Sequence, residues 1–162
     1  MSLLHPDGSI SSVAFLLAQV GACAAEEFAK GLAPLKFTPC DAGILRLLRN
    51  SPGLSQQDLA RSLEMHASRL VAVIDALESR GLVAREENAR DRRTYSLKLT
   101  SSGNEALLQI GQVARRHNEA LCSTLDQDER NQLADLLARI AAKYELRPSV
   151  HPGYKKLDRR AE

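Results

Sequence analysis

The hydrophobic residues of this 162-residue chain recur at three- and four-residue intervals in six stretches. This spacing is typical of the single apolar face of an α-helix, whereas a half-buried strand alternates every second residue. In the first stretch, for example, Val13, Leu17 and Val20 fall on one such face. The pattern therefore predicts helices over 11–30, from 39 to a turn at 50–53, and over 56–63, 66–80, 101–124 and 127–145.

Short polar residues stand at the expected starts of four of these helices. Their side chains can accept hydrogen bonds from the unpaired N–H groups of the first helical turn. We expect this capping role for Thr38, Ser55, Thr100 and Asp126. Gly81 follows the stretch at 66–80, where it can adopt the left-handed conformation that ends a helix. Because only a short turn separates 56–63 from 66–80, these two helices form a helix-turn-helix.

Two β-type runs follow, at 82–86 and 94–99, and in the second run Tyr95, Leu97 and Leu99 alternate onto one face. The residues between the runs are polar and turn-forming, so the pair is predicted to be a hairpin with a charged tip. A helix-turn-helix followed by a hairpin is a winged helix. The predicted fold is therefore mainly α with a small β-hairpin wing, flanked by N-terminal and C-terminal helices.

Composition adds limits to this picture. Hydrophobic residues make up 44% and charged residues 26% of the chain, which are values of a folded globular protein. No apolar stretch is long enough to span a membrane and no export signal is visible, so we expect a cytoplasmic protein with no membrane partner. The net charge is only +2, although the chain from Lys143 onward carries six basic and three acidic residues. Any site that binds a polyanion must therefore rely on a local cluster of basic residues and not on the net charge of the chain.

Nothing in the sequence favours an enzyme. Cys23, Cys40 and Cys122 are widely spaced and have no histidine at ligand spacing, so we expect reduced thiols and neither disulfide nor metal. The chain has no glycine-rich phosphate loop and no hydrolase or metalloprotease motif. We therefore expect no catalytic residues and no cofactor.

Four segments around the helix-turn-helix resemble the MarR family of bacterial transcription regulators in sequence, order and spacing. The matching segments are LSQQDLA at 54–60, LESRGLV at 77–83, Arg85 with DRR at 91–93, and LKLTSSG at 97–103. The resemblance implies a homodimer whose terminal helices interlock, with two winged helices facing adjacent major grooves of a pseudo-palindromic operator. The apolar faces of the flanking helices favour self-association independently, because no other domain is available to cover them.

This resemblance divides one structural domain into four parts. They are an N-terminal dimerisation helix at 1–36, a winged helix-turn-helix at 37–100, C-terminal dimerisation helices at 101–146 and a basic, irregular tail at 147–162. The implied function is sequence-specific regulation of transcription, as a repressor that a small effector releases from double-stranded DNA.

On the helix at 66–80, a 100° step per residue places Ser68 and Ala72 opposite the core residue Leu70, with Arg69 and Val71 on the flanks. The first turns of such a helix enter the major groove, where arginine can read guanine and apolar groups can contact thymine methyls. The family often has polar residues where this chain has Val71 and Ala72, which predicts an unusual base preference. The competing explanation is that Arg69 and Ser68 are merely solvated.

Further contacts are expected from the wing and from the preceding helix start. The full set of predicted DNA-contacting residues is Ser55, Gln56, His66, Ser68, Arg69, Val71, Ala72, Arg85, Arg90, Arg92 and Arg93. The resemblance implies that Asp91 and Arg93 pair to hold the wing, while Arg90 and Arg92 reach the minor groove. Capping alone would also explain Ser55 and Gln56, and His66 could be either a contact or a cap.

The resemblance also places an effector pocket between the dimerisation helices and the winged helix. The predicted wall residues are Phe15, Gln19, Phe37, Cys40, Arg115, Arg116 and His117. A cation there suits an aromatic carboxylate or a phenol. His117 lies on the apolar face of its helix, so packing in the core or in an interface is the competing explanation for that residue.

Two further functions remain open. Some family members sense peroxides through a cysteine of the first helix, and Cys23 lies there, but the tyrosines expected to activate such a thiol are elsewhere, at Tyr95, Tyr144 and Tyr154. We therefore expect Cys23 to be buried and inert. The second possibility is that the winged helix binds another protein. The arginine-rich wing favours DNA over a protein partner.

Overall fold

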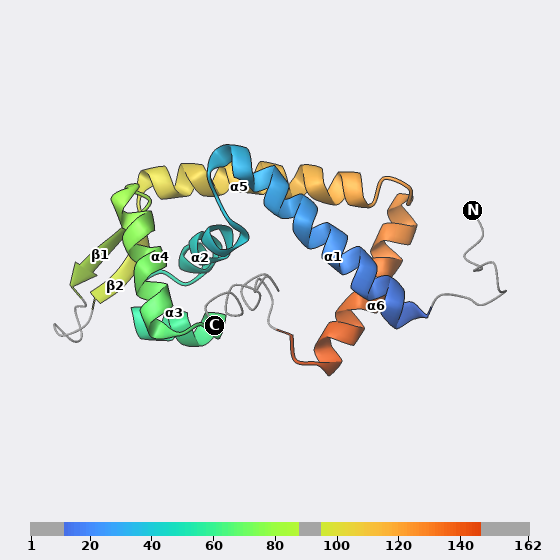
Figure 1. Cartoon of the computed structure of the whole chain (residues 1–162), viewed down its shortest axis with the longest axis horizontal. Coiled ribbons are helices and arrows are strands. Elements are labelled where there is room, and N and C mark those ends of the chain that lie inside the picture. Colours follow the sequence, from blue (N-terminus) through green and yellow to red (C-terminus); the bar gives the residue numbers. More distant parts are fainter. Residues whose placement is uncertain (1–11, 88–94, 147–162) are drawn as a thin grey trace.

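The computed structural model describes residues 12–87 and 95–146, which form a mainly helical chain with one antiparallel hairpin (Figure 1). The elements in chain order are α1 (Val13–Leu32), the short 3₁₀ turn η1 (Ala33–Leu35), α2 (Pro39–Asn50), α3 (Gln56–Leu63), α4 (Ala67–Ser79), β1 (Val83–Glu87), β2 (Tyr95–Leu99), α5 (Ser101–Leu121) and α6 (Gln127–Lys143). The predicted winged-helix fold is confirmed.

The molecule is elongated, with different elements at its two ends. Helices α1 and α5 both extend along its length and contact each other, and Figure 1 shows that they diverge toward the α6 end. At one end, α2, α3, α4 and the β1–β2 hairpin gather into the winged helix, and α6 lies at the opposite end. We call the first group the winged unit, and α1, α5 and α6 the outer helices.

Local side-chain hydrogen bonds fix where the helices begin. All four predicted caps are observed, at Thr38, Ser55, Thr100 and Asp126. At Thr38 the hydroxyl accepts from the Asp41 N–H at 3.1 Å, and the Asp41 carboxylate accepts from the Thr38 N–H at 2.8 Å. This reciprocal arrangement satisfies two N–H groups that the helix itself leaves unpaired. His66 stands at the start of α4 but makes no such side-chain bond, so its capping role is not observed.

One hydrophobic core holds the winged unit together and extends to the near ends of α1 and α5. Its most deeply buried large side chains are Leu32, Ile44, Leu45, Leu48, Leu59, Leu70, Ile74, Leu77, Val83 and Leu97. They come from α1, α2, α3, α4 and both strands. Burying a side chain of this size contributes about 1.5–3 kcal/mol, so this cluster fixes the angle at which α4 is presented.

The hairpin pairs Val83 with Leu99 at its base and Glu87 with Tyr95 at its outer end. Two further backbone bonds join β2 to the segment before α3, because Leu97 donates to the Leu54 carbonyl at 2.9 Å and accepts from the Gly53 N–H at 3.2 Å. These bonds tie the wing to the start of α3, so the two parts of the winged unit are positioned together.

The alternating residues of the second strand differ in burial. Tyr95 is 54% exposed, whereas Ser96 is buried and donates to the Glu86 carbonyl at 3.3 Å. The reason is that Tyr95 lies at the outer end of the hairpin, opposite the exposed Glu87. Tyr95 lies beyond the last core side chain, and only Leu97 reaches fully into the core.

Helix α5 begins against the turn that follows α4. The Thr100 hydroxyl donates to the Gly81 carbonyl at 2.6 Å, and the Thr100 N–H donates to the Leu82 carbonyl at 3.1 Å. Gly81 has a φ of +69°, the left-handed value predicted for it. A Cβ added to Gly103 would overlap the Leu82 carbonyl oxygen, so only glycine permits this approach.

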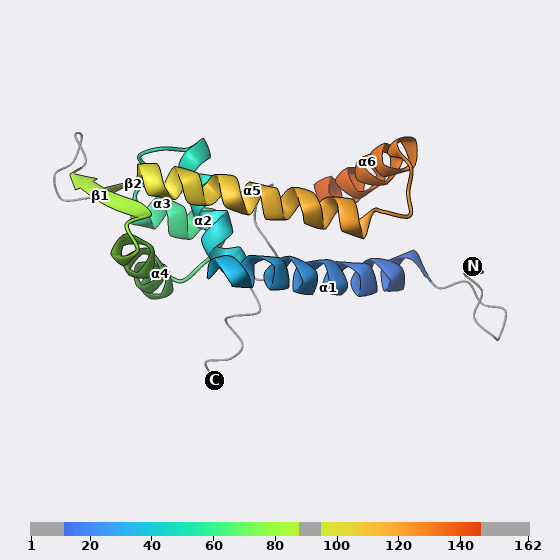
Figure 2. The same ribbon diagram turned by 90° about the horizontal axis from the view of Figure 1, so that it is seen from above.

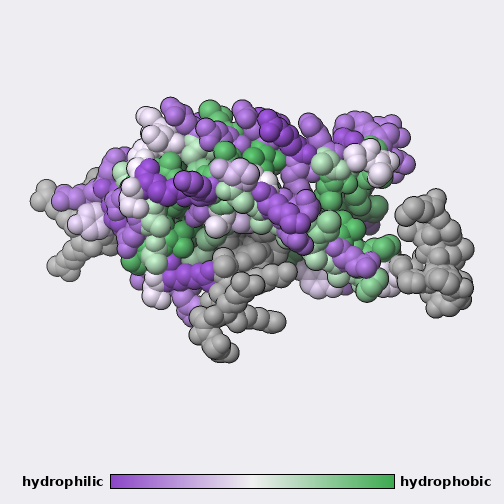
Figure 3. All heavy atoms as spheres, turned by 45° about the horizontal axis from the view of Figure 1, so that its top comes forward, coloured by the Kyte–Doolittle hydropathy of each residue, from purple (hydrophilic) through white to green (hydrophobic). Residues whose placement is uncertain are grey.

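The outer helices leave much of their apolar surface uncovered. Figure 3 shows hydrophobic residues gathered over the α6 end of the molecule. The exposed apolar residues of these helices include Val13, Phe15, Leu17, Val20, Leu108, Leu121, Leu133, Leu136, Leu137 and Ile140. None of the helices in the described part of the chain is long and apolar enough to cross a membrane.

Candidate nucleic-acid interface

Helix α4 presents one face to the core and the other to solvent, as the sequence predicts. Leu70, Ile74 and Leu77 are buried, whereas Ser68 and Ala72 on the other side are exposed. An apolar side chain, Val71, is also 41% exposed on this outer face. The face therefore combines a hydroxyl with small apolar groups on a helix held rigidly by the core.

Arg69 and His66 lie at the start of this face. His66 is exposed at the helix N-cap, and Arg69 is half-buried. Burial and the charge of Asp41 together raise the pKa of the nearby Cys40 thiol to about 11, although the positive charge of Arg69 opposes the shift. Arg69 is therefore close to the start of α2 as well as to the outer face of α4.

The start of α3 is the second part of the candidate interface. The Ser55 hydroxyl accepts from the Asp58 N–H at 3.1 Å and donates to the Asp58 carboxylate at 2.7 Å, so the cap uses this side chain fully. The amide nitrogen of Gln56 is buried and has no hydrogen-bond partner among the described residues. A polar group in this state is costly, which makes Gln56 the least satisfied residue of the helix start.

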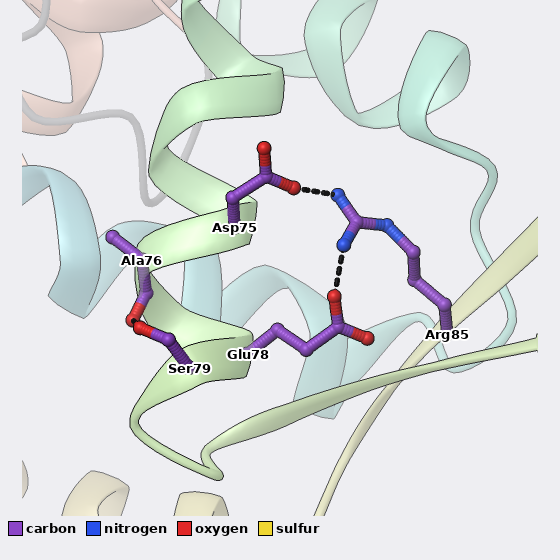
Figure 4. Close-up of polar contacts among 5 residues, drawn as sticks. All are labelled: Asp75, Ala76, Glu78, Ser79 and Arg85. Carbon is purple, nitrogen blue, oxygen red and sulfur yellow. Dashed lines mark hydrogen bonds and ion pairs between the residues drawn. The ribbon is translucent and has the colours of Figure 1, made fainter.

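Arg85 of β1 lies against α4 instead of projecting freely from the wing. One terminal nitrogen of its guanidinium donates to Asp75 and the other donates to Glu78 (Figure 4). Partial burial lowers the pKa of Arg85, but the hydrogen bond to Asp75 and the charge of Glu78 outweigh it and raise the pKa above its ordinary value. These two carboxylates were not identified as part of the site from the sequence.

The tip of the wing carries the remaining predicted contacts. Arg90, Asp91, Arg92 and Arg93 lie outside the described residues, so their predicted roles stay predictions. The tail at 147–162 lies outside them too. Within the described part of the hairpin, Glu86 of β1 forms an ion pair with Lys98 of β2.

A cavity of about 530 Å³ lies between α1 and α5. It is lined by Cys23, Glu27, Gly31, Val113, Arg116, His117, Ala120 and Leu121. The His117 ring is half-buried and packs against the ring of Phe28, with centroids 5.6 Å apart. The cavity therefore combines an apolar wall with two basic side chains and one carboxylate.

The residues predicted to line an effector pocket lie in three different environments. Arg116 and His117 line this cavity, whereas Phe37 and Cys40 are buried in the core of the winged unit and are closed to a ligand. Phe15, Gln19 and Arg115 are exposed and do not line it. A signal for the lining of this cavity was present in the sequence, because Cys23, Glu27 and Gly31 recur every four residues and so share one face of their helix.

Cys23 is exposed, so its predicted burial is wrong within this chain. The reason is that the core covers only the far end of α1, near Leu32, and leaves the middle of the helix open toward the cavity. Among the described residues there is no cluster of His, Cys, Asp and Glu side chains suited to a metal ion.

The fold and this arrangement define a winged helix-turn-helix protein. The MarR family model matches residues 37–95, the region that carries α2, α3, α4 and β1. A Thauera aromatica protein, whose name assigns it to transcriptional regulation of the hcr operon, is 38% identical over 103 residues, which are 64% of this chain. The match spans 62% of the length of that relative.

Solved structures extend the likeness to the outer helices. The transcriptional repressor CouR, bound to a 23-mer DNA duplex, is 34% identical with a TM-score of 0.71 over 80% of this chain and 92% of CouR. A MarR mutant from E. coli, complexed with operator DNA, is 26% identical with a TM-score of 0.67 over 79% of this chain and 92% of that one. The chain belongs to the MarR family of transcriptional regulators.

Proposed function

We propose that this protein is a sequence-specific regulator of transcription that binds double-stranded DNA and acts as a repressor, without enzymatic activity. The observation that carries the proposal is the outer face of α4, where Ser68, Val71 and Ala72 are exposed on a helix fixed by the core. The DNA-bound structures of CouR and MarR support the same function.

The first turns of α4 would enter the major groove. Arg69 would read a guanine, and Val71 with Ala72 would meet thymine methyl groups. Arg90 and Arg92 would reach the flanking minor groove, with the wing held by Asp91 and Arg93, and the backbone N–H groups at the start of α3 would contact phosphate. His66 remains a candidate contact, because its side chain makes no capping bond.

The active species would be a homodimer on a pseudo-palindromic operator. The apolar faces of the outer helices support this, since Val13, Leu17, Leu133, Leu136, Leu137 and Ile140 line an open groove between α1 and α6. In this proposal residues 1–36 and 101–146 serve dimerisation and residues 37–100 bind DNA. Half-site centres would lie about one helical turn, roughly 10 bp, apart.

A site-selection experiment with random duplexes tests base reading by α4. We expect Arg69→Ala to relax the selected sequence at one position of each half-site, while Arg46→Ala, an equal charge change on α2, leaves the selected sequence intact. Wild-type affinity should fall with salt by about 0.9 log units per log unit of salt for each neutralised phosphate. An equal loss by Arg69→Ala on all sequences contradicts base reading, and a wild type that selects no sequence contradicts the proposed function.

The effector would be a small aromatic carboxylate or phenol in the α1–α5 cavity. Arg116 could pair with a carboxylate while the apolar wall of Val113 and Leu121 holds the ring. Such a ligand can release the protein from DNA only if it binds the DNA-incompetent state more tightly.

A titration of operator-bound protein with simple aromatic acids tests this. Arg116→Ala should weaken release at least about tenfold without altering ligand-free DNA binding, because one charge-assisted hydrogen bond is worth about 1.5–3 kcal/mol. Arg115→Ala, which removes the same charge from a neighbouring residue outside the cavity, is the matched control. Equal effects of the two variants contradict the assignment of the cavity.

A thiol-based input is the competing hypothesis, and the exposure of Cys23 within the same cavity supports it. In that case peroxide releases the protein from DNA, Cys23→Ser abolishes the response and aromatic acids have no effect. A third outcome is that the folded protein does not bind duplex DNA, or binds it with an affinity that salt does not change. Either result would favour a protein-interaction module.

A further inference from the structure

We propose that Arg85 is a positioning residue that neutralises two carboxylates of the recognition helix, and that it is not itself a contact to DNA phosphate. The inference rests on the proposed DNA binding by α4. It assigns a role to the Arg85–Asp75–Glu78 cluster in Figure 4, which we call the α4 ion cluster.

The geometry of the cluster joins two elements. Asp75 and Glu78 are three residues apart on α4 and therefore lie on one side of the helix, toward the strand that carries Arg85. Each carboxylate receives a different terminal nitrogen of the guanidinium, so one planar group spans both acids. The Arg85 side chain is only 20% exposed, which places this contact at the junction of α4 and the wing.

The charge on α4 explains why the cluster matters for DNA. The helix carries one cation, Arg69, and two carboxylates, Asp75 and Glu78. Without a counter-ion it would present a net negative charge to a phosphate backbone that carries one negative charge per ~1.7 Å of duplex axis. Arg85 brings the local sum of charge to zero, so the two acids no longer outweigh the positive charge at the start of the helix.

A direct phosphate contact would require Arg85 to leave both acids. Each released carboxylate would then face the duplex without a counter-ion, and like-charge juxtaposition at an interface costs several kcal/mol. Arg85 also differs from lysine, because a guanidinium can donate to two acceptors in one plane whereas an ammonium is a single point charge. Two carboxylates bound by one guanidinium therefore favour an intramolecular role for Arg85.

The test measures affinity for a selected operator duplex by fluorescence anisotropy. We expect Arg85→Met to weaken binding at least about tenfold, since two carboxylates become uncompensated. Adding Asp75→Asn and Glu78→Gln to Arg85→Met should restore affinity to within about threefold of wild type, because the charge that opposed DNA is gone. A direct phosphate contact by Arg85 would not be regained in this triple variant.

Removing two acids also raises net charge, so the control adds Glu119→Gln and Asp135→Asn to Arg85→Met. These two exposed acids lie on α5 and α6, away from the winged unit, and their removal gives the same formal charge. Rescue by both triple variants would overturn the proposal, because it would show general attraction only. So would an unrescued loss in the first triple variant.

The salt dependence separates the two roles of Arg85 a second way. The log–log slope of the first triple variant should match that of wild type, whereas loss of a phosphate contact would reduce the slope by about 0.9 per half-site. If Arg85→Met does not fold, Arg85→Lys takes its place in the experiment. Adding Asp75→Asn to Arg85→Lys should then raise the affinity for the operator several-fold. An unchanged affinity would overturn the proposal. Operator binding by Arg85→Met equal to wild type refutes the counter-ion role alone, whereas absent binding by wild type refutes the proposed function.

Discussion

The winged unit and the outer helices use the same residue type in opposite ways. Leu45, Leu59 and Leu97 of the winged unit are fully buried within one chain, whereas Leu136 of α6 is 53% exposed and Leu108 of α5 is 70% exposed. Large buried apolar side chains supply most of the stability of a small domain. The winged unit thus has a core of its own, while the outer helices have an apolar face with no counterpart in the described chain.

The largest effect expected from this difference is on stability. Leu97→Ala should lower the free energy of unfolding by about 2–5 kcal/mol, because it leaves a cavity where the strand meets the core. Urea unfolding measures the loss, with Leu108→Ala as the control for the same truncation at an exposed position. A similar loss for both variants would mean that exposure within one chain does not distinguish the two regions.

The next effect is the pH dependence of stability that the buried thiol of Cys40 produces. Burial raises the pKa of Cys40 from 9.0 to about 11 in the folded protein. Above pH 9 the unfolded chain therefore loses the thiol proton before the folded chain does, and the stability contributed by Cys40 falls as the pH rises toward 11. At pH 10.5 this loss is about 2 kcal/mol relative to pH 8.

Urea unfolding of wild type and Cys40→Ala at pH 8 and pH 10.5 measures this loss as a change in the difference between the two proteins. Leu108→Ala, which changes an exposed side chain with no titratable group, is the control and should stay at a constant difference from wild type. A constant difference for Cys40→Ala as well would contradict the burial of its thiol in solution.

A third effect addresses the outer helices directly. Leu136→Asp should raise the dissociation constant of the homodimer at least about tenfold, equivalent to about 1.4 kcal/mol, while the helical content of the monomer is retained. Sedimentation over a range of concentrations measures it. Ala138→Asp adds the same charge on the opposite side of α6 and should leave the dimer intact; if it dissociates the dimer equally, the apolar face is not the interface.

The smallest effect is expected where the two regions are alike. Thr38→Ala in the winged unit and Asp126→Ala before α6 each remove a side-chain cap, and each should cost about 1 kcal/mol of stability. Thermal unfolding at one fixed protein concentration compares them. Near-equal losses of stability would show that the two regions differ in apolar burial and not in how their helices begin. A cost at Asp126 several times larger would contradict this.

The sequence was most informative where structure depends on near neighbours. The capping residues act within three positions of themselves, so Thr38, Ser55, Thr100 and Asp126 could be identified directly. The helical spacing also placed Leu70, Ile74 and Leu77 in the core, because these residues share one face of α4. Helix ends were less accurate, and α1 begins at Val13, two residues later than predicted.

Features that depend on distant parts of the chain were missed. The pairing of Arg85 with two acids of α4 follows from the angle between a helix and a strand, which periodicity does not encode. Cys23 lies in the middle of α1, beyond the part of this helix that the core covers, and its predicted burial was therefore wrong. The exposure of Tyr95 likewise depends on how far the core extends beneath the wing.

The seating of Gly103 and Thr100 against the turn after α4 makes α5 a lever. Its 21 residues span about 30 Å at 1.5 Å per residue. A tilt of about 5° at one end of such a rod moves the other end by about 2.6 Å. Because the start of α5 is hydrogen-bonded to Gly81 and Leu82 and the cavity lies along its distal half, a change in the tilt of α5 alters how far apart α4 and the distal end of α5 lie. In the proposed DNA-binding dimer, displacements at the distal end of α5 that are smaller than the rise of one base pair, about 3.4 Å, would thus alter the separation of the two α4 helices.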